Sequence, residues 1–144
     1  MPDNKQGYLG LPWGASEADL RAKNFEVYRS LDLDSLRRGY SVTSVTLTEG
    51  QIPAMADFSF KDGRLVGVYL RFRVSDFRLM TRRLTYRYGR ASLEEPDRLI
   101  WRGGRTSILM LRSSITPDMA SVHLLEPEEW EALSSYQPSG ESES

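Results

Sequence analysis

The chain has 144 residues, 40% of them hydrophobic, and a net charge of −1. This length suits one domain with its own core, and the absence of cysteine excludes a disulfide framework and a zinc site built from His and Cys. The charge is segregated: residues 64–105 carry +7, residues 106–144 carry −6 and residues 1–63 carry −2. Such segregation indicates either a docking surface for an anionic partner or two parts of one chain that meet on folding.

The first predicted element is a short helix over residues 17–23. Ser16 can cap its first turn, which is acidic as the helix dipole favours. Residues 25–39 stay ambiguous between a second helical turn and a packed loop. Residues 1–6 contain no apolar run, so we expect neither a signal peptide nor a membrane span, although a leader already removed would leave the same pattern.

Strands follow in the middle of the chain. Residues 40–47 are rich in β-branched side chains, and Pro53 separates them from the next strand. Residues 58–60 and 65–74 predict a hairpin, because Asp62-Gly63 tolerates the positive φ angles of a tight turn.

The second arm of that hairpin alternates between two faces. Its even positions are apolar, which sends them to the core. Its odd positions include Tyr69, Arg71 and Arg73, which therefore lie on the other face.

The central helix is predicted to begin after Ser75 and Asp76, to run to Tyr88 and to end at Gly89. Phe77, Met80, Leu84 and Tyr88 share one side of it, and that side should pack on the sheet.

Beyond the central helix, residues 99–101 and 106–111 predict a second hairpin, and residues 120–125 a last strand. Residues 108–111 are apolar at every position, so something must cover both faces of that strand. Pro127 then opens a short helix.

The predicted order is helix, three strands, helix, three strands, helix. We therefore expect an α+β fold, an antiparallel sheet built from two helix-plus-three-strand meander units with the helices mainly on one face. The shared plan raises the hypothesis of a pseudo-repeat. Residues 1–136 should form a single domain, and residues 137–144 a disordered polar tail.

Catalytic signatures are missing. His123 is the only histidine, lies in an alternating strand and is expected to be structural. No nucleophile elbow, phosphate loop or dinucleotide motif accompanies it. We therefore expect a protein that is not an enzyme and that uses no cofactor and no metal.

The outer side of the central helix is the first candidate contact surface. Leu79, Arg82 and Tyr86, flanked by Arg78 and Arg83, lie opposite its core side. Arginine and tyrosine beside an aliphatic residue are typical of protein contacts, so we expect a partner-binding helix. The alternative is that the acidic C-terminal segment, anchored by Trp130 and Leu133, covers this helix.

The sheet face that carries Tyr69, Arg71 and Arg73 is the second candidate surface. Aromatic and basic residues together also suit single-stranded nucleic acid, and the helix adds Arg78, Arg82, Arg83 and Arg87. These two sets fall on opposite sides of the predicted sheet, which does not favour one basic track. Nucleic-acid binding is therefore the alternative, and a domain that binds a small ligand or lipid in an apolar pocket is a third hypothesis.

The chain resembles small uncharacterised bacterial domains with a Gly-x-x-Trp-Gly-x-Ser opening, here Gly10 to Ser16. The likeness continues in residues 60–65, in residues 84–89 with their final Tyr-Gly, and in Trp101 followed by Thr106-Ser-Ile-Leu. Many such domains are exported or lipid-anchored, which implies an accessory or envelope role without catalysis. Tandem helix and meander units also occur in the outer-membrane assembly lipoprotein family and in β-lactamase inhibitor proteins, both protein binders.

From the sequence we expect a non-enzymatic accessory or adaptor subunit that binds another protein within a bacterial assembly. The chain as given shows no leader and no lipidation cysteine, which favours the cytoplasm. A periplasmic or envelope location is the alternative if a leader has been removed.

Overall fold

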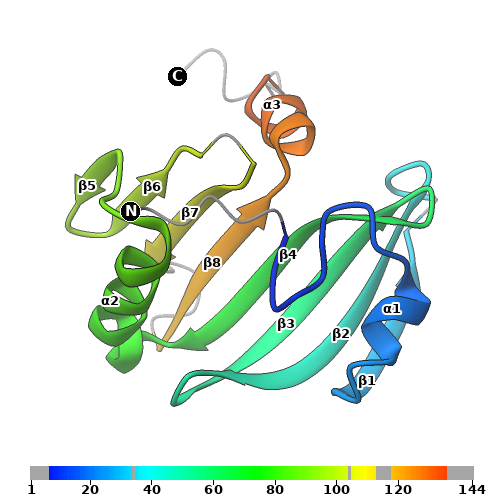
Figure 1. The fold of residues 1–144 in the computed structure, drawn as a ribbon, viewed down its shortest axis with the longest axis horizontal. Helices are drawn as coiled ribbons and strands as arrows, with labels where there is room; N and C mark the ends of the chain where they lie inside the picture. The colour runs from blue at the N-terminus through cyan, green and yellow to red at the C-terminus, as the bar shows by residue number, and fades with distance from the viewer. Residues whose placement is uncertain (1–6, 34, 104, 113–117, 136–144) are drawn as a thin grey trace.

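The structure is a computed structural model that describes residues 7–33, 35–103, 105–112 and 118–135. One antiparallel sheet of eight strands dominates it, in the order β1-β2-β3-β4-β8-β7-β6-β5 (Figure 1). The strands are β1 (Glu26–Asp32), β2 (Tyr40–Glu49), β3 (Ile52–Lys61), β4 (Arg64–Arg73), β5 (Leu93–Glu95), β6 (Arg98–Trp101), β7 (Ser107–Arg112) and β8 (Met119–Leu125). The chain's two halves join in the middle of this sheet, where β4 pairs with β8.

Three short helices accompany the sheet. They are α1 (Glu17–Arg21), α2 (Phe77–Tyr88), which follows the 3-10 turn η1 (Val74–Asp76), and α3 (Pro127–Ser135). The predicted fold class, an α+β sheet of two helix-plus-three-strand meander units, is therefore wrong. The fold is a single sheet dominated by its eight strands, because β1 and β5 add two strands that the sequence pattern did not reveal.

The length of β3 also differs from the prediction. Pro53 lies inside β3 instead of before it, opposite Thr48 of β2. Pairing between β3 and β4 begins only at Met55. Because Pro53 lies before this point, its missing N–H does not remove a hydrogen bond between these two strands.

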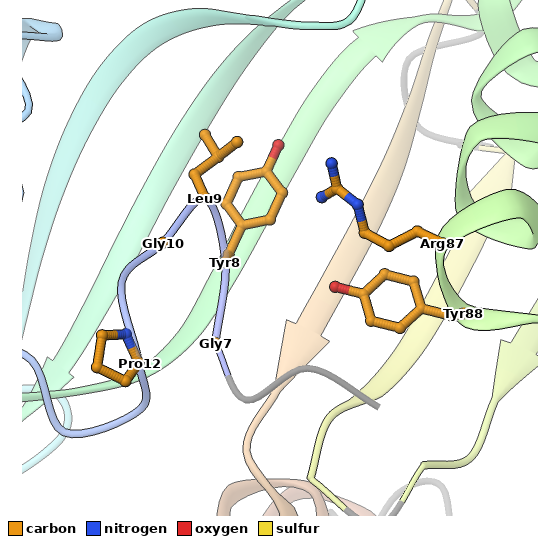
Figure 2. A pocket seen from close by; sticks show the side chains of 7 residues that line it. All are labelled: Gly7, Tyr8, Leu9, Gly10, Pro12, Arg87 and Tyr88. Carbon is orange, nitrogen blue, oxygen red and sulfur yellow. The ribbon is translucent and has the colours of Figure 1, made fainter. Parts of the chain in front are cut away.

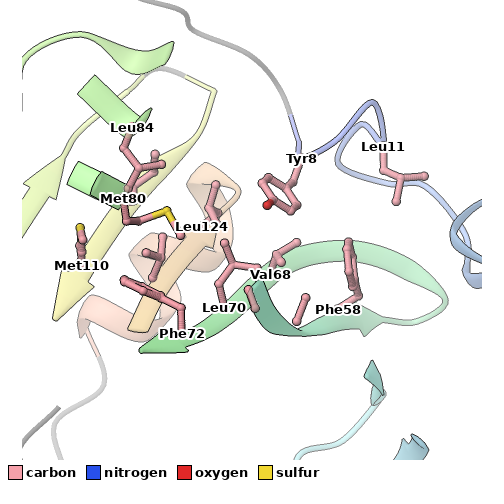
Figure 3. Close-up of a cluster of buried hydrophobic side chains, with 14 of the residues drawn as sticks. Tyr8, Leu11, Phe58, Val68, Leu70, Phe72, Met80, Leu84, Met110 and Leu124 are labelled. Carbon is pink, nitrogen blue, oxygen red and sulfur yellow. The ribbon is translucent and has the colours of Figure 1, made fainter. Parts of the chain in front are cut away.

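The core lies on the face of the sheet that α2 and the N-terminal segment cover (Figure 3). Met80 and Leu84 of α2 are buried there with Phe72 and Met110. The segment of residues 7–15 covers the sheet farther along, where Tyr8 packs against Phe58 with their ring centroids 6.3 Å apart.

Hydrogen bonds hold this N-terminal segment in place. Gly14 donates its backbone N–H to Leu65, and Leu65 donates to Ala15. The buried Trp13 indole N–H donates to the Arg105 carbonyl, 2.8 Å away. The Gly-x-x-Trp-Gly-x-Ser opening therefore joins the first half of the chain to the second.

The opposite face of the sheet lacks such a layer. In the described residues only α3 lies over it, near the ends of β8 and β7 (Figure 1). None of the described helices is long and apolar enough to span a bilayer. The predicted polar tail, residues 137–144, lies outside the described residues.

Candidate functional site

The predicted partner-binding residues of α2 separate into two groups. Tyr86 has 93% of its surface exposed, and Arg78 and Arg82 are exposed with it. Leu79 instead packs against the core, and Arg83 binds a buried carboxylate within the chain. Arg78, Arg82 and Tyr86 therefore remain as the free part of the predicted helix surface.

That carboxylate belongs to Glu49, whose side chain is 4% exposed at the end of β2. It accepts the Tyr8 hydroxyl at 2.6 Å and the Nε and Nη2 of Arg83 at 2.9 and 2.7 Å, with Arg87 3.6 Å away. Burial, and then the Glu49 charge, raise the pKa of Tyr8 above its usual range. The buried charge is thus paired and hydrogen-bonded, as a buried carboxylate must be.

A hollow of about 180 Å³ lies between the N-terminal segment and α2. Arg87 and Tyr88 face Tyr8 across it (Figure 2). Its residues belong to the same contact that fixes the segment, so we assign this hollow a structural role.

The acidic C-terminal helix binds away from α2. The Glu129 carboxylate of α3 is buried and accepts Arg37 Nη2 and the Tyr40 hydroxyl, each at 2.7 Å. Burial and this carboxylate raise the pKa of Tyr40 to about 12. Glu131 lies 3.5 Å from Arg102, so acidic and basic parts of the chain meet here on folding.

The face opposite α2, which we call the open face, carries the second predicted set. Cross-strand register places Asp57 beside Tyr69, Tyr69 beside His123, and His123 beside Leu109. Tyr69 and His123 stack with ring centroids 4.4 Å apart. An aromatic pair therefore stands at the centre of the open face.

Arg71 extends this row toward β1. Its Nη2 lies 3.5 Å from the Asp57 carboxylate and 3.4 Å from the Tyr28 hydroxyl, and its guanidinium sits 5.8 Å from the Tyr69 ring centre. Ser44 holds the other Asp57 oxygen at 2.6 Å. Arg71 Nε is buried without a hydrogen-bond partner among the described residues, although buried donors are normally satisfied.

Two hollows flank this central row. One, of about 440 Å³, is lined by Met55, Arg71, Arg73 and Met119, with residues from the neighbouring strand ends. The other, of about 450 Å³, lies between α3 and strands β6, β7 and β8. It is lined by Arg98, Ile100, Leu109, Leu111, His123, Leu125 and Trp130.

Acid–base or metal chemistry has little basis on this surface. Burial lowers the pKa of His123, which favours its neutral form, and its aromatic neighbour is Tyr69 rather than an acid. The described residues contain no cluster of His, Asp and Glu that could hold a metal ion.

The structure brings Tyr69, Arg71 and Arg73 together on the open face. Arg78, Arg82 and Tyr86 lie on α2, on the opposite side of the sheet. Sequence reasoning did not assign Met55 or Trp130 to this face. Met55 was missed because the beginning of β3 was not predicted, and Trp130 because its helix was considered only as the alternative cover of the central helix.

Comparisons with known proteins add little. No protein-family model matches the chain, and no curated protein is similar to it. A solved structure of a cysteine-rich secretory protein from Staphylococcus aureus is similar over 94% of this chain, with 15% sequence identity and a TM-score of 0.47. The chain spans about half of that protein, 52% of its length.

Proposed function

We propose that the chain is a non-enzymatic accessory module that binds another protein through its open face. The observation that carries the proposal is the composition of this face. Met55 is exposed on this sheet surface, and Tyr69, His123, Leu109 and Arg71 are partly exposed beside it; of the described helices only α3 lies over this face (Figure 1). Aromatic residues, methionine and arginine are the types that protein interfaces favour.

Hollows beside the aromatic pair support the same proposal. Interface anchors of a partner insert into pockets and carry most of the binding free energy. The two hollows of the open face, about 440 and 450 Å³, could each receive such an anchor. The exposed part of α2 offers one aromatic side chain, Tyr86, so we rank it second.

The charge distribution argues against nucleic acid as the partner. Several arginines of the basic segment are paired with acids of the chain itself, Arg71 with Asp57, and Arg83 and Arg87 with Glu49. The remaining cations, such as Arg73 and Arg82, lie on opposite faces. Retention on heparin that is lost as salt rises would nevertheless favour nucleic acid.

Co-purification from the cells that encode the chain tests the proposal. Met55→Glu with Arg73→Glu places acid on the open face at two exposed positions, and Arg82→Glu with Tyr86→Ala is the matched control on α2. Quantitative mass spectrometry should show partner proteins that the open-face variant loses and the control retains. Partners lost only by the control would assign binding to α2 and contradict the open face, and equal retention by both would contradict both surfaces.

A further inference from the structure

The hollow beneath α3 has the features of a small-ligand site. It measures about 450 Å³, within the range of roughly 300–1,000 Å³ that such sites occupy in proteins. Its floor comes from three neighbouring strands and its roof from Trp130 of α3. A site between a sheet and a helix can hold a ligand on two sides.

The floor is apolar, and among the described residues Trp130 is the side chain that α3 places over it. Ile100, Leu109 and His123 form one cross-strand row, and Leu111 and Leu125 lie beside it. The opposite faces of β7 and β8 already supply the core with Ile108 and Leu124. A sheet face that only meets water normally carries polar side chains, so these aliphatic residues indicate an apolar occupant.

The edge of the hollow beneath α3 carries positive charge. Arg98 lines the hollow, and no Asp or Glu is among the lining residues that the structure describes. The Arg102 guanidinium lies 5.3 Å from the Trp130 ring centre. Arg98 pairs with Glu95 at 3.0 Å, but both side chains are nearly half exposed. Such exposed pairs contribute little free energy, so a ligand carboxylate can replace Glu95.

We propose that this hollow binds a small amphiphilic carboxylate, with the apolar body on Ile100, Leu109 and Leu111 and the carboxylate on Arg98. A ligand with several phosphates would lack further cations in the lining. A fully apolar ligand would form no ion pair with the Arg98 guanidinium. The ligand would occupy the same hollow that the proposed protein contact offers to a partner's anchor, so the test must distinguish these two occupants.

Isothermal titration with octanoate, and with octanamide as its uncharged counterpart, tests the site. We expect octanoate to bind with a dissociation constant below about 1 mM and to change the fluorescence of Trp130, and octanamide to bind about tenfold more weakly. Arg98→Gln should reduce octanoate affinity about tenfold and leave octanamide unchanged, since it removes only the charge-assisted contact.

Two further variants complete the test. Arg78→Gln, an exposed arginine on the opposite side of the molecule, should bind octanoate like the unmodified chain. Leu109→Asp should abolish binding of both probes, and its circular dichroism and melting temperature establish whether the fold survives. The proposal would be overturned if octanoate at about 10 mM did not bind the unmodified chain. It would also be overturned if Arg98→Gln bound octanoate with the same affinity as the unmodified chain. Loss of co-purifying proteins in Leu109→Asp, with no octanoate binding to the unmodified chain, would assign the hollow to the protein contact instead.

Discussion

Individual residues show why two of the chain's acids are buried. Glu49 and Glu129 each sit at the end or border of an element and each receives one tyrosine hydroxyl and at least one arginine. Neither role could be predicted, because a glutamate at the end of a strand or in a first helical turn normally faces water. Each carboxylate joins segments far apart in the sequence.

Glu49→Gln keeps the size of the side chain and removes its charge. The Tyr8 hydroxyl and the Arg83 guanidinium then lose a charged partner in a buried place, although Arg83 remains partly exposed. The free energy of unfolding should fall by about 2–3 kcal/mol, measured by urea denaturation. Glu95→Gln, which breaks the exposed pair with Arg98, should cost less than about 0.5 kcal/mol, and equal costs in the two variants would contradict this account.

His123 should make stability depend on pH. Burial lowers its pKa in the folded state, so below about pH 6.5, the ordinary histidine pKa, the unfolded chain binds more protons than the folded one. Stability is therefore complete above that pH and is lost as pH falls. The charged group in the same hollow is Arg98, whose positive charge does not favour protonation of His123.

Denaturation of the unmodified chain and of His123→Phe between pH 7.5 and 5.5 measures this effect. The variant should lose less stability over that interval. Burial raises the pKa of Glu126, which acts in the opposite direction, but it does so in both proteins and cancels in the comparison. The same slope in both proteins would show that His123 is not the titrating group.

Elements with a strong pattern were predicted well and exposed elements were not. β4 and α2 differ from the predicted ranges by one or two residues, because an alternating strand and a helix ending at a glycine are unambiguous. β1 is an edge strand whose side chains are nearly all exposed. Its sequence therefore lacks the alternation of apolar and polar residues that identifies a strand with one buried face. β5 has only three residues and depends on pairing with β6.

The position of α3 depends on tertiary contacts and can be tested separately from the sheet. Glu129→Ala removes the acceptor of Arg37 and Tyr40, and so should release this helix from β2. Amide hydrogen exchange should accelerate in α3 by about tenfold or more, with little change in the central strands β4 and β8. Glu128→Ala, at an exposed neighbouring position, is the control, and equal acceleration in both variants would contradict the assigned anchor.

At the scale of the whole molecule, folding pairs some of the segregated charges with one another. Glu129 and Glu131 of the acidic part bind Arg37 and Arg102, and Glu49 of the first part binds Arg83. The sequence left docking and internal pairing open, since charge alone does not reveal which segments become neighbours. Folding leaves a sheet with one covered face and one open face, and the open face is the surface that we propose for a partner (Figure 1).

Oxidative footprinting of Met and Tyr side chains in the partner complex tests the central claim, that the open face is the contact surface. Met55 and Tyr28 lie on that face with 37% and 41% of their surface exposed, and Tyr86 marks the α2 side. We predict that the partner protects Met55 and Tyr28 and leaves the labelling of Tyr86 unchanged. Protection of Tyr86, with Met55 and Tyr28 labelled as in the free chain, would contradict the account.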